Sequence, residues 1–397
     1  MAQILKDMKQ KLWIVSEMFY PNEVSTSFIL THIANRMTSK YDVNILCCST
    51  NEEKTESFSI NKHIKILRLP FPQNHSYNLA FRILRSIYIC LGLCWKLLIK
   101  SSSHDKVLIV TNPVSLVLLI SVIKFFRKFE LSILVHDVFP ENTISAHLIH
   151  SKKSLIYLFF KTLFDRAYAN ADKIIVLGHD MKKVIAKKVA NYGNPQITII
   201  PNWADLDQVH PITRKNKKII TIQYSGNLGR VQGIIELLDF FKKANNKNIQ
   251  FNIWGKGALE KNIKSFIKKN PQLNIKFKGK YNRSQQTAVL NDCDLSIITL
   301  ADGMYGLGVP SKSYNIMASG KPILFIGPTE SEIALLVKKA NIGFVFAPSE
   351  KDAIIDFLRK INIKDLGKLK DMGNNARKLA INEYSRDKIL NNFLNFI

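Results

Sequence analysis

The sequence has few cysteines, and their spacing matches no disulfide framework and no zinc site. Its 397 residues include five, namely Cys47, Cys48, Cys90, Cys94 and Cys293. Their odd number and the lack of a C-x-x-C pair argue against a disulfide-stabilised secreted scaffold and against a zinc-binding module. We therefore expect reduced thiols, buried in the core of a cytosolic protein.

The sequence also lacks an apolar run suited to a signal peptide or a membrane span. Near the N-terminus only Leu12–Val15 is apolar, which is shorter than a signal-peptide core. Val107–Ile123 is interrupted by Asn112-Pro113, which predicts a buried strand, a turn, and a helix that begins at the proline. Leu79–Lys100 contains four basic residues, so it is not a span either.

Acidic residues are scarce: 31 stand against 57 lysines and arginines, which gives a net charge of +26. Such an excess indicates a polyanionic partner, namely nucleic acid, an anionic bilayer or phosphorylated substrates. No zinc knuckle, RNP-type strand or helix-turn-helix signature is present, so we expect no nucleic-acid partner. The pairs Lys182-Lys183 and Lys187-Lys188 are expected on solvated helix faces.

What the sequence does contain is a repeated order of strand, loop and helix, which predicts parallel sheets covered by helices. In the first half, strands are predicted at Leu12–Ser16, Val43–Cys48, Ile64–Leu69, Val107–Val110, Ser132–His136, Lys173–Leu177 and Gln196–Ile200. Helices are predicted at Phe28–Met37, Leu79–Lys100, Val114–Lys128, Leu155–Ala169 and His179–Val189.

The pattern restarts after Trp203, with strands at Ile219–Tyr224, Asn248–Trp254, Leu273–Lys278, Leu295–Thr299, Pro322–Ile326 and Gly343–Phe346. Helices follow these strands at Ile234–Ala244, Leu259–Lys269, Ser284–Asn291, Lys312–Ala318 and Glu330–Ala340. A boundary near residue 208 separates an N-terminal domain, 1–207, from a C-terminal domain, 208–397, whose last helix is free to return to the N-terminal domain. The fold class is therefore α/β, with two Rossmann-like domains whose parallel sheets face each other across a cleft.

A glycine-rich turn, Tyr224–Gly233, lies between a predicted strand and a predicted helix. Glycines at 226, 229 and 233 allow close approach of the backbone, and the following helix would direct its N–H groups at an anion such as a diphosphate. Arg230 would add a charge-assisted contact. The spacing is not G-x-G-x-x-G, and an ordinary turn between strand and helix is an equal alternative.

The segment Val309–Pro322 is the most distinctive. Ser311 is expected as the N-cap of a short helix that Gly320 ends. Lys312 and Asn315 would share one face near the helix N-terminus, behind a glycine-containing loop at 303–308. The alternative is a capped surface helix with its lysine in solvent; the bracketing glycine loops favour a ligand site.

His136 and Asp137 follow an apolar strand, where polar residues usually face the ligand crevice. A lone histidine is more often structural, but an adjacent acid at a strand end favours function. Asp292-Cys293-Asp294 has the form of a D-x-D metal motif, yet it is better explained as a polar connector between helix and strand, so no metal is assigned.

Leu79–Lys100 is predicted to be an amphipathic helix. Its polar residues, Arg82, Arg85, Ser86, Lys96 and Lys100, fall on one narrow face. The pattern fits a helix in a membrane interface with basic residues toward anionic headgroups. A core helix with a solvated stripe is equally compatible.

Several segments, in this order, resemble glycosyltransferase family 4, which has the GT-B fold. They are Ser16–Pro21, His136–Glu141, Ile200–Asp205, the glycine-rich turn at 226–233, and the Pro-Ser-Lys to Gly-Lys-Pro run at 310–322. The similarity extends over nearly the whole chain and is greatest to bacterial polysaccharide and lipid-linked oligosaccharide assembly enzymes.

The resemblance implies a retaining hexosyl- or N-acetylhexosaminyltransferase that uses a nucleotide-diphosphate sugar, expected to be a UDP-sugar, without a metal or other cofactor. The acceptor would be a glycan or a polyprenyl-diphosphate-linked glycan of capsule or O-antigen type. The enzyme would bind the anionic inner face of the cytoplasmic membrane as a peripheral protein.

The resemblance also implies roles for individual residues. His136 would bind the donor sugar, and Asp137 would orient the site or the acceptor. Acceptor-binding residues would be Tyr20, Ser25 and Thr26. Donor-binding residues would be Gly226, Asn227, Gly229, Arg230, Gly306, Ser311, Lys312 and Asn315.

The chain departs from the family pattern at the donor site and in the first loop. Leu307 and Asn315 occupy the positions of the frequent E-x7-E glutamates, and Gln232 occupies that of a lysine. The first loop has Ser25-Thr26-Ser27 in place of a glycine pair. Two alternatives to an active transferase follow: a binding subunit that supports a partner enzyme, or a GT-B nucleotide-sugar epimerase.

Overall fold

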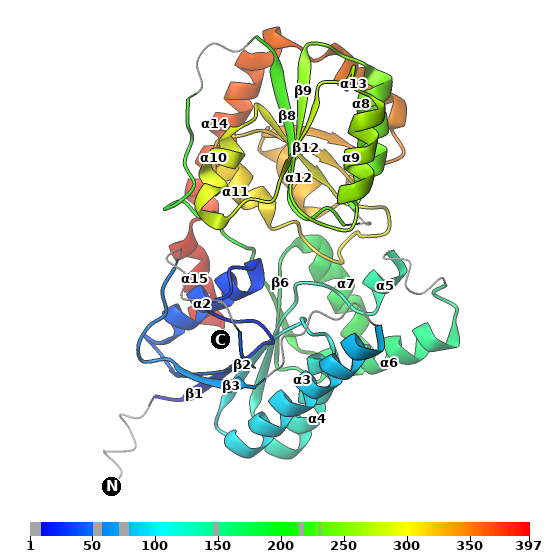
Figure 1. Cartoon of the computed structure of the whole chain (residues 1–397). Helices are drawn as coiled ribbons and strands as arrows, with labels where there is room; N and C mark the ends of the chain where they lie inside the picture. The colour runs from blue at the N-terminus through cyan, green and yellow to red at the C-terminus, as the bar shows by residue number, and fades with distance from the viewer. Residues whose placement is uncertain (1–8, 51–57, 71–78, 146–150, 214–217, 230–231) are drawn as a thin grey trace. The chain divides into compact units, whose positions relative to one another are not determined.

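The computed structural model describes residues 9–50, 58–70, 79–145, 151–213, 218–229 and 232–397 (Figure 1). The chain divides into two compact units. Unit 1 comprises Met1–Glu141, Ser151–Ile200 and Leu390–Ile397, and unit 2 comprises Asn142–His150 and Pro201–Ile389. The expected boundary near residue 208 thus lies shortly after the point where the main segment of unit 2 begins.

Unit 1 is built on a seven-stranded parallel sheet in the order β3-β2-β1-β4-β5-β6-β7. The strands are β1 (Lys11–Val15), β2 (Asp42–Cys48), β3 (Lys65–Leu69), β4 (Lys106–Val110), β5 (Glu130–Leu134), β6 (Lys173–Val176) and β7 (Gln196–Ile199). The central strands β1 and β4 are apolar and almost wholly buried, as strands covered on both faces must be. The chain order reverses between β1 and β4, so their carboxyl ends form the topological switch point.

The helices of the N-terminal half are α2 (Ser25–Met37), α3 (Leu79–Lys100), α4 (Ser115–Arg127), α5 (Glu141–Ser145), α6 (Leu155–Ala169) and α7 (His179–Val189). Helix α4 packs against both α3 and α6, and α6 packs against α7. Helix α2 begins at Ser25, earlier than the predicted Phe28; the serine and threonine residues here enter a helix at a lower cost than a glycine pair would. Helix α4 begins at Ser115, so the prediction that Pro113 starts it is wrong.

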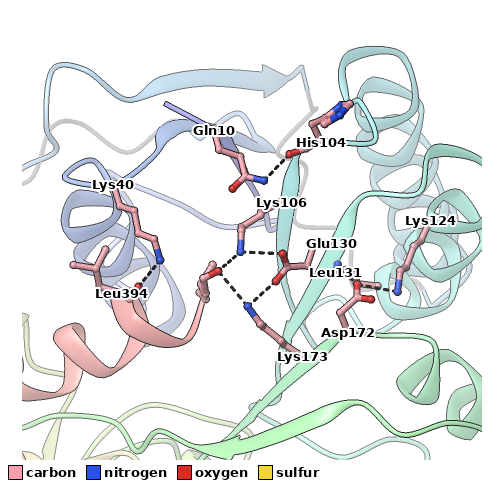
Figure 2. Close-up of polar contacts among 11 residues, drawn as sticks. Gln10, Lys40, His104, Lys106, Lys124, Glu130, Leu131, Asp172, Lys173 and Leu394 are labelled. Atoms are coloured by element: carbon pink, nitrogen blue, oxygen red, sulfur yellow. Dashed lines mark hydrogen bonds and ion pairs between the residues drawn. The ribbon is translucent and has the colours of Figure 1, made fainter. Parts of the chain in front are cut away.

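The C-terminal segment Leu390–Ile397 belongs to unit 1. Figure 2 shows how polar contacts gather at the amino ends of the strands. Lys106 donates a hydrogen bond to the carbonyl of Ile397. Glu130 pairs with Lys106 at 2.9 Å and with Lys173 at 2.6 Å. The segment is thereby tied to the same edge of the sheet as β4, β5 and β6.

Unit 2 is built on a six-stranded parallel sheet in the order β10-β9-β8-β11-β12-β13. The strands are β8 (Ile220–Ser225), β9 (Ile249–Trp254), β10 (Ile275–Gly279), β11 (Leu295–Thr299), β12 (Ile323–Ile326) and β13 (Gly343–Phe346). Every residue of β8 and β11 is buried, which marks the centre of the core. The chain order reverses at this pair of strands.

The helices of unit 2 are α8 (Ile234–Ala244), α9 (Glu260–Lys269), α10 (Gln286–Asn291), α11 (Lys312–Ala318), α12 (Glu332–Lys339), α13 (Lys351–Lys360), α14 (Leu366–Glu383) and the start of α15 (Arg386–Phe396). The first five correspond to predicted helices. The last three follow one another without an intervening strand, and α13 and α14 were not predicted.

All five cysteines lie in the described part of the chain, are buried, and form no disulfide. Burial raises the pKa of Cys47 to about 11 and that of Cys94 to about 12. These thiols are therefore protonated and unreactive near neutral pH, as expected of core residues. Among the described helices, none is both long enough and apolar enough to cross a bilayer.

Candidate active site

Two loops of unit 2 emerge side by side from the centre of its sheet. β8 and β11 are paired neighbours, and the chain leaves β8 at Gly226 and leaves β11 toward Lys312. In parallel α/β sheets, ligands bind beyond the carboxyl ends of strands at such a reversal of strand order. The topology thus places most of the expected donor-binding residues at the edge where a ligand is bound.

Lys312 packs its ammonium group against the loop that follows β8. Its Nζ lies 3.9 Å from the centroid of the Tyr224 ring. A Cβ on Gly226, whose φ is 147°, would lie 3.3 Å from the same Nζ. Burial lowers the pKa of Lys312 to about 7, and none of the described carboxylates pairs with it. The amine therefore has no counter-charge, titrates near neutral pH, and lies beside a backbone position that lacks a side chain.

The backbone of this loop is held by the ends of β8 and β9. The Tyr224 hydroxyl donates to the carbonyl of Asn227 at 2.8 Å, and the N–H of Gly226 donates to the carbonyl of Trp254 at 3.0 Å. Gly255 has a φ of 145°, and a Cβ there would overlap the carbonyl oxygen of Gly226. The close approach of the two loops therefore requires glycine at position 255.

The remaining expected donor residues differ in their placement. Arg230 lies outside the described residues. Gly306, with a φ of 68°, lies in the loop after β11. Ser311 precedes α11 but makes no capping hydrogen bond, because its backbone is already helical whereas a capping residue is extended. Ser313 instead donates from its hydroxyl to the carbonyl of Pro310 at 2.7 Å.

Asn315 has a structural role in the described residues. Its side-chain oxygen accepts a hydrogen bond from the backbone N–H of Asp205 at 2.9 Å, and its amide nitrogen donates to Gln286 at 3.3 Å. Leu307, at the other glutamate position of the family motif, is 5% exposed. An amide that joins α11 to Asp205 and a buried apolar residue therefore stand where the family that the sequence resembles often has carboxylates.

In unit 1, His136 and Asp137 follow β5 and are held by a residue at the end of β4. The hydroxyl oxygen of Thr111 accepts the backbone N–H of His136 at 3.1 Å and that of Asp137 at 3.2 Å. Thr111 is buried and lies beside the switch point of the sheet. Thr111 was not identified from the sequence, although it is a polar residue directly after the predicted strand Val107–Val110.

The imidazole of His136 is neutral in this setting. Its Nε2 is buried and has no hydrogen-bond partner among the described residues. Burial lowers the pKa of His136 to about 4, and burial raises the pKa of Asp137. A neutral imidazole donates one hydrogen bond and accepts another, which suits the recognition of a hydroxyl rather than of an anion.

A buried ion-pair cluster holds Glu141, at the other end of the segment that begins with His136. Lys188, 4% exposed, lies 2.7 Å from Glu141 and 2.6 Å from Asp165. The expectation of a solvated lysine is wrong here, because α7 packs against α6 and brings Asp165 opposite Lys188. The other three lysines of these pairs, Lys182, Lys183 and Lys187, are exposed.

The expected acceptor-binding residues lie after β1. Tyr20 is half-buried in the loop, and Ser25 and Thr26 form the first turn of α2, with Ser25 exposed. Glu17, directly beyond β1, pairs with Arg85 of α3 at 2.6 Å. This ion pair at the switch point was not anticipated from the sequence.

The D-x-D residues act as connectors. A carboxylate oxygen of Asp294 accepts the backbone N–H of Thr221 at 2.9 Å, and Asp292 accepts the side-chain amide of Asn252 at 3.0 Å. Among the described residues, no group of three or more histidine, cysteine, aspartate or glutamate side chains is arranged to hold a metal ion.

Comparison with known proteins follows the same division of the chain. Residues 205–379 match the family model described as glycosyl transferases group 1. The sequence is 29% identical to a Pseudomonas aeruginosa protein named "Probable glycosyltransferase WbjE", over 94% of this chain and 95% of that protein.

Solved structures share the architecture at low identity. WaaG, a glycosyltransferase involved in lipopolysaccharide biosynthesis, aligns with a TM-score of 0.69 at 13% identity, over 97% of this chain and 99% of WaaG. HepE of Anabaena, solved with UDP and glucose, aligns with a TM-score of 0.68 at 14% identity, over 97% and 98% of the two chains. The chain is a GT-B glycosyltransferase.

In this glycosyltransferase the segment that matches the family model includes β8, β11 and α11, with Gly226 and Lys312. His136, Asp137 and Thr111 lie before that segment, in unit 1.

Proposed function

We propose that this glycosyltransferase is a retaining enzyme of family 4. It transfers a hexose or an N-acetylhexosamine from a UDP-sugar to a glycan or a polyprenyl-diphosphate-linked acceptor during assembly of a cell-surface polysaccharide. It works as a peripheral protein at the inner face of the cytoplasmic membrane. The observation that carries the proposal is the unpaired Lys312 ammonium beside Gly226 at the centre of the unit 2 sheet.

The chemistry of a diphosphate leaving group fits this arrangement. Cleavage of the bond between the anomeric carbon and the diphosphate develops negative charge on the departing oxygen. A cation held nearby in a water-poor site stabilises that charge without prior reorganisation. Lys312, protonated when a diphosphate lies beside it, supplies such a cation, and the missing side chain of Gly226 leaves room for the phosphate oxygens.

His136 is assigned to the donor sugar. A neutral imidazole with an unsatisfied buried Nε2 gains a hydrogen bond when a sugar hydroxyl reaches it. Asp137 is assigned to orientation of the site or the acceptor. A retaining front-face mechanism needs no protein nucleophile, which suits a chain whose sequence shows no obvious carboxylate pair.

The relatives support the substrate classes. HepE is solved with UDP and glucose, which favours a UDP-sugar as donor. WaaG is a lipopolysaccharide enzyme, and a further relative, 23% identical over 252 residues, is named for colanic acid biosynthesis. Both favour an acceptor that belongs to a growing surface glycan.

The first test is thermal stabilisation of the purified chain by a panel of UDP-, GDP- and other nucleotide sugars. A donor that binds the native state raises the melting temperature by mass action, about 2.7 kcal/mol of stabilisation at a hundredfold excess over Kd. Lys312→Met should lose the shift, and Lys351→Met, at an exposed site in the same unit, should retain it. A shift of equal size in both variants would remove Lys312 from the site.

The second test uses the donor identified in the first. The anomeric configuration of the transferred sugar, read by NMR, should match that of the donor, and inversion would overturn the retaining assignment. An epimerase would convert the donor sugar without any acceptor. A chain that binds donor but releases no nucleoside diphosphate with any lipid-linked acceptor would favour a supporting subunit.

A further inference from the structure

Helix α3 turns two of its basic side chains toward the protein and its apolar side chains outward. Arg85 pairs with Glu17, and the Nζ of Lys96 donates to the carbonyl of Arg68 at 2.7 Å. The exposed stripe is formed instead by Leu84, Ile87, Tyr88, Leu91, Trp95 and Ile99, of which Leu84 is 65% and Trp95 64% exposed. The basic residues of this helix were expected to face headgroups or solvent, and for Arg85 and Lys96 both expectations are wrong, because these side chains bond to Glu17 and to the backbone of Arg68.

The apolar surface continues onto the two neighbouring helices. On α4, Val122, Phe125 and Phe126 are exposed, with Phe125 at 77%. On α6 the exposed residues are Leu155, Ile156, Leu158, Phe159 and Phe160. Because α4 packs against both α3 and α6, the three helices that carry these stripes belong to one region of unit 1 (Figure 1). Of the 21 exposed large apolar side chains in the described residues, 14 lie on these three helices.

The exposed charges in this region are predominantly basic. The exposed charged residues on α3, α4 and α6 and at their ends are Lys100, Lys128, Lys152, Lys153 and Arg166. Asp165 of α6 is buried and paired with Lys188, and Asp172, just after α6, is exposed but pairs with Lys124 of α4 at 2.8 Å. The clustered aromatic and aliphatic side chains suit the acyl region of a bilayer, and the lysines and arginines at their border suit its anionic headgroups.

We propose that α3, α4 and α6 form a membrane-binding face that unit 1 inserts into the headgroup and acyl boundary of an anionic bilayer. The face gives a physical basis to the proposed membrane location and is independent of the transfer reaction. Exposed apolar patches of this extent are rare on soluble monomers unless another surface covers them. A bilayer is the favoured occupant because exposed basic side chains border the apolar stripes, and the exposed Asp172 beside them is paired with Lys124.

Trp95 provides an internal reporter of insertion. It is 64% exposed, whereas Trp13 and Trp203 are 3% and 6% exposed and Trp254 is half-buried. Addition of vesicles of phosphatidylglycerol and phosphatidylcholine should shift tryptophan emission to shorter wavelength. Lipids brominated on the acyl chains should then quench it. Trp95→Phe should abolish both signals while the protein still sediments with the vesicles.

The matched variants separate insertion from folding. The pair Phe125→Gln with Phe126→Gln should lower the vesicle partition coefficient by about tenfold or more, because apolar area is lost from the inserted face. The control pair Leu335→Gln with Ile381→Gln replaces residues of unit 2 that are 43% and 46% exposed, and should bind vesicles as the unaltered chain does. Both pairs should keep the native circular dichroism spectrum and the donor-induced thermal shift.

Three results would overturn the proposal. They are failure of the unaltered chain to bind anionic vesicles at low salt, binding that leaves Trp95 unquenched, and equal loss of binding in both variant pairs. A lipid-free dimer in sedimentation velocity that shields Trp95 from acrylamide would assign the face to a second copy of the chain. Because donor binding is measured separately, failure of this proposal is distinguishable from failure of the proposed glycosyl transfer.

Discussion

The Nζ of Lys312 lies 3.9 Å from the centroid of the Tyr224 ring, so the ring faces a cation that has no carboxylate partner among the described residues. The hydroxyl group of Tyr224 donates a hydrogen bond to the carbonyl of Asn227 in the glycine-rich turn. A ring face attracts the ammonium by its quadrupole but does not neutralise it. The pair therefore holds Lys312 in position while it leaves the charge available to an anion.

This arrangement predicts proton uptake when the donor binds. Burial lowers the pKa of Lys312 to about 7, so at pH 8 most of the free protein carries a neutral amine. A bound diphosphate favours the charged form and raises this pKa, so binding at pH 8 takes up a proton and binding at pH 6 does not. Donor affinity should be flat below pH 7 and fall above it, by at most about tenfold per pH unit.

Isothermal titration in two buffers of different ionisation enthalpy measures this uptake directly. At pH 8 the observed enthalpies should differ between buffers, and at pH 6 they should agree. Lys312→Met should bind weakly and show no buffer dependence at either pH. Equal enthalpies in both buffers at pH 8 for the unaltered chain would contradict the assignment of Lys312 to the diphosphate.

Thr111→Val should weaken the segment that carries His136. The isosteric change removes one acceptor shared by two partly buried backbone N–H groups of unit 1. We expect a loss of about 1–3 kcal/mol in the free energy of unfolding, a lower kcat and a weaker donor affinity, because His136 is assigned to the donor sugar. The control is Thr162→Val, which removes a hydrogen bond to the carbonyl of Leu158 within α6. If Thr162→Val lowers kcat as much as Thr111→Val does, Thr111 has no specific role in positioning His136.

Lys188→Met should be among the most destabilising single changes in unit 1. It would remove the cation shared by the buried Asp165 and the half-buried Glu141, while Asp165 keeps its pair with Lys161, so we expect a cost of about 2–3 kcal/mol in the free energy of unfolding. The adjacent exposed lysine gives a matched control, since Lys187→Met should change that free energy by about 0.5 kcal/mol or less. Urea denaturation of both variants measures the difference, and similar midpoints would show that the cluster contributes little.

The fold was predictable because its signals are local. Short β-branched runs such as Val107–Val110 and Leu295–Thr299, each followed by an amphipathic stretch, specify strand and helix without knowledge of their neighbours. The environment of a residue could not be predicted from the sequence where it depends on the packing of one helix against another. Lys188 belongs to a basic run that is otherwise solvated, and it is buried because α6 supplies Asp165 across the helix pair.

The site was predictable in part for the same reason. Gly226 and Lys312 were singled out by the turns around them, but their proximity required the pairing of β8 with β11. Asn315 was expected to bind donor, yet its amide is committed to Asp205, a contact 110 residues away in sequence. The outward apolar stripe of α3 was hidden because periodicity identifies two faces without saying which one the protein covers.

The last prediction concerns the approach of two loops at the donor site. Gly255→Ala places a Cβ where the carbonyl oxygen of Gly226 lies, so either the β9 loop or the glycine-rich turn must move. Gly279→Ala is the matched control, because its φ of 80° is also left-handed but no atom lies within 4 Å of the added Cβ.

The control should lose only the backbone term, about 1–2 kcal/mol in the free energy of unfolding. Gly255→Ala should lose more and should also lose the donor-induced rise in melting temperature, because Gly226 no longer leaves room beside Lys312. Melting curves with and without donor give both quantities. If Gly255→Ala is destabilised yet keeps the full donor-induced shift, the diphosphate does not lie against the glycine-rich turn, and the donor site must be sought elsewhere in unit 2.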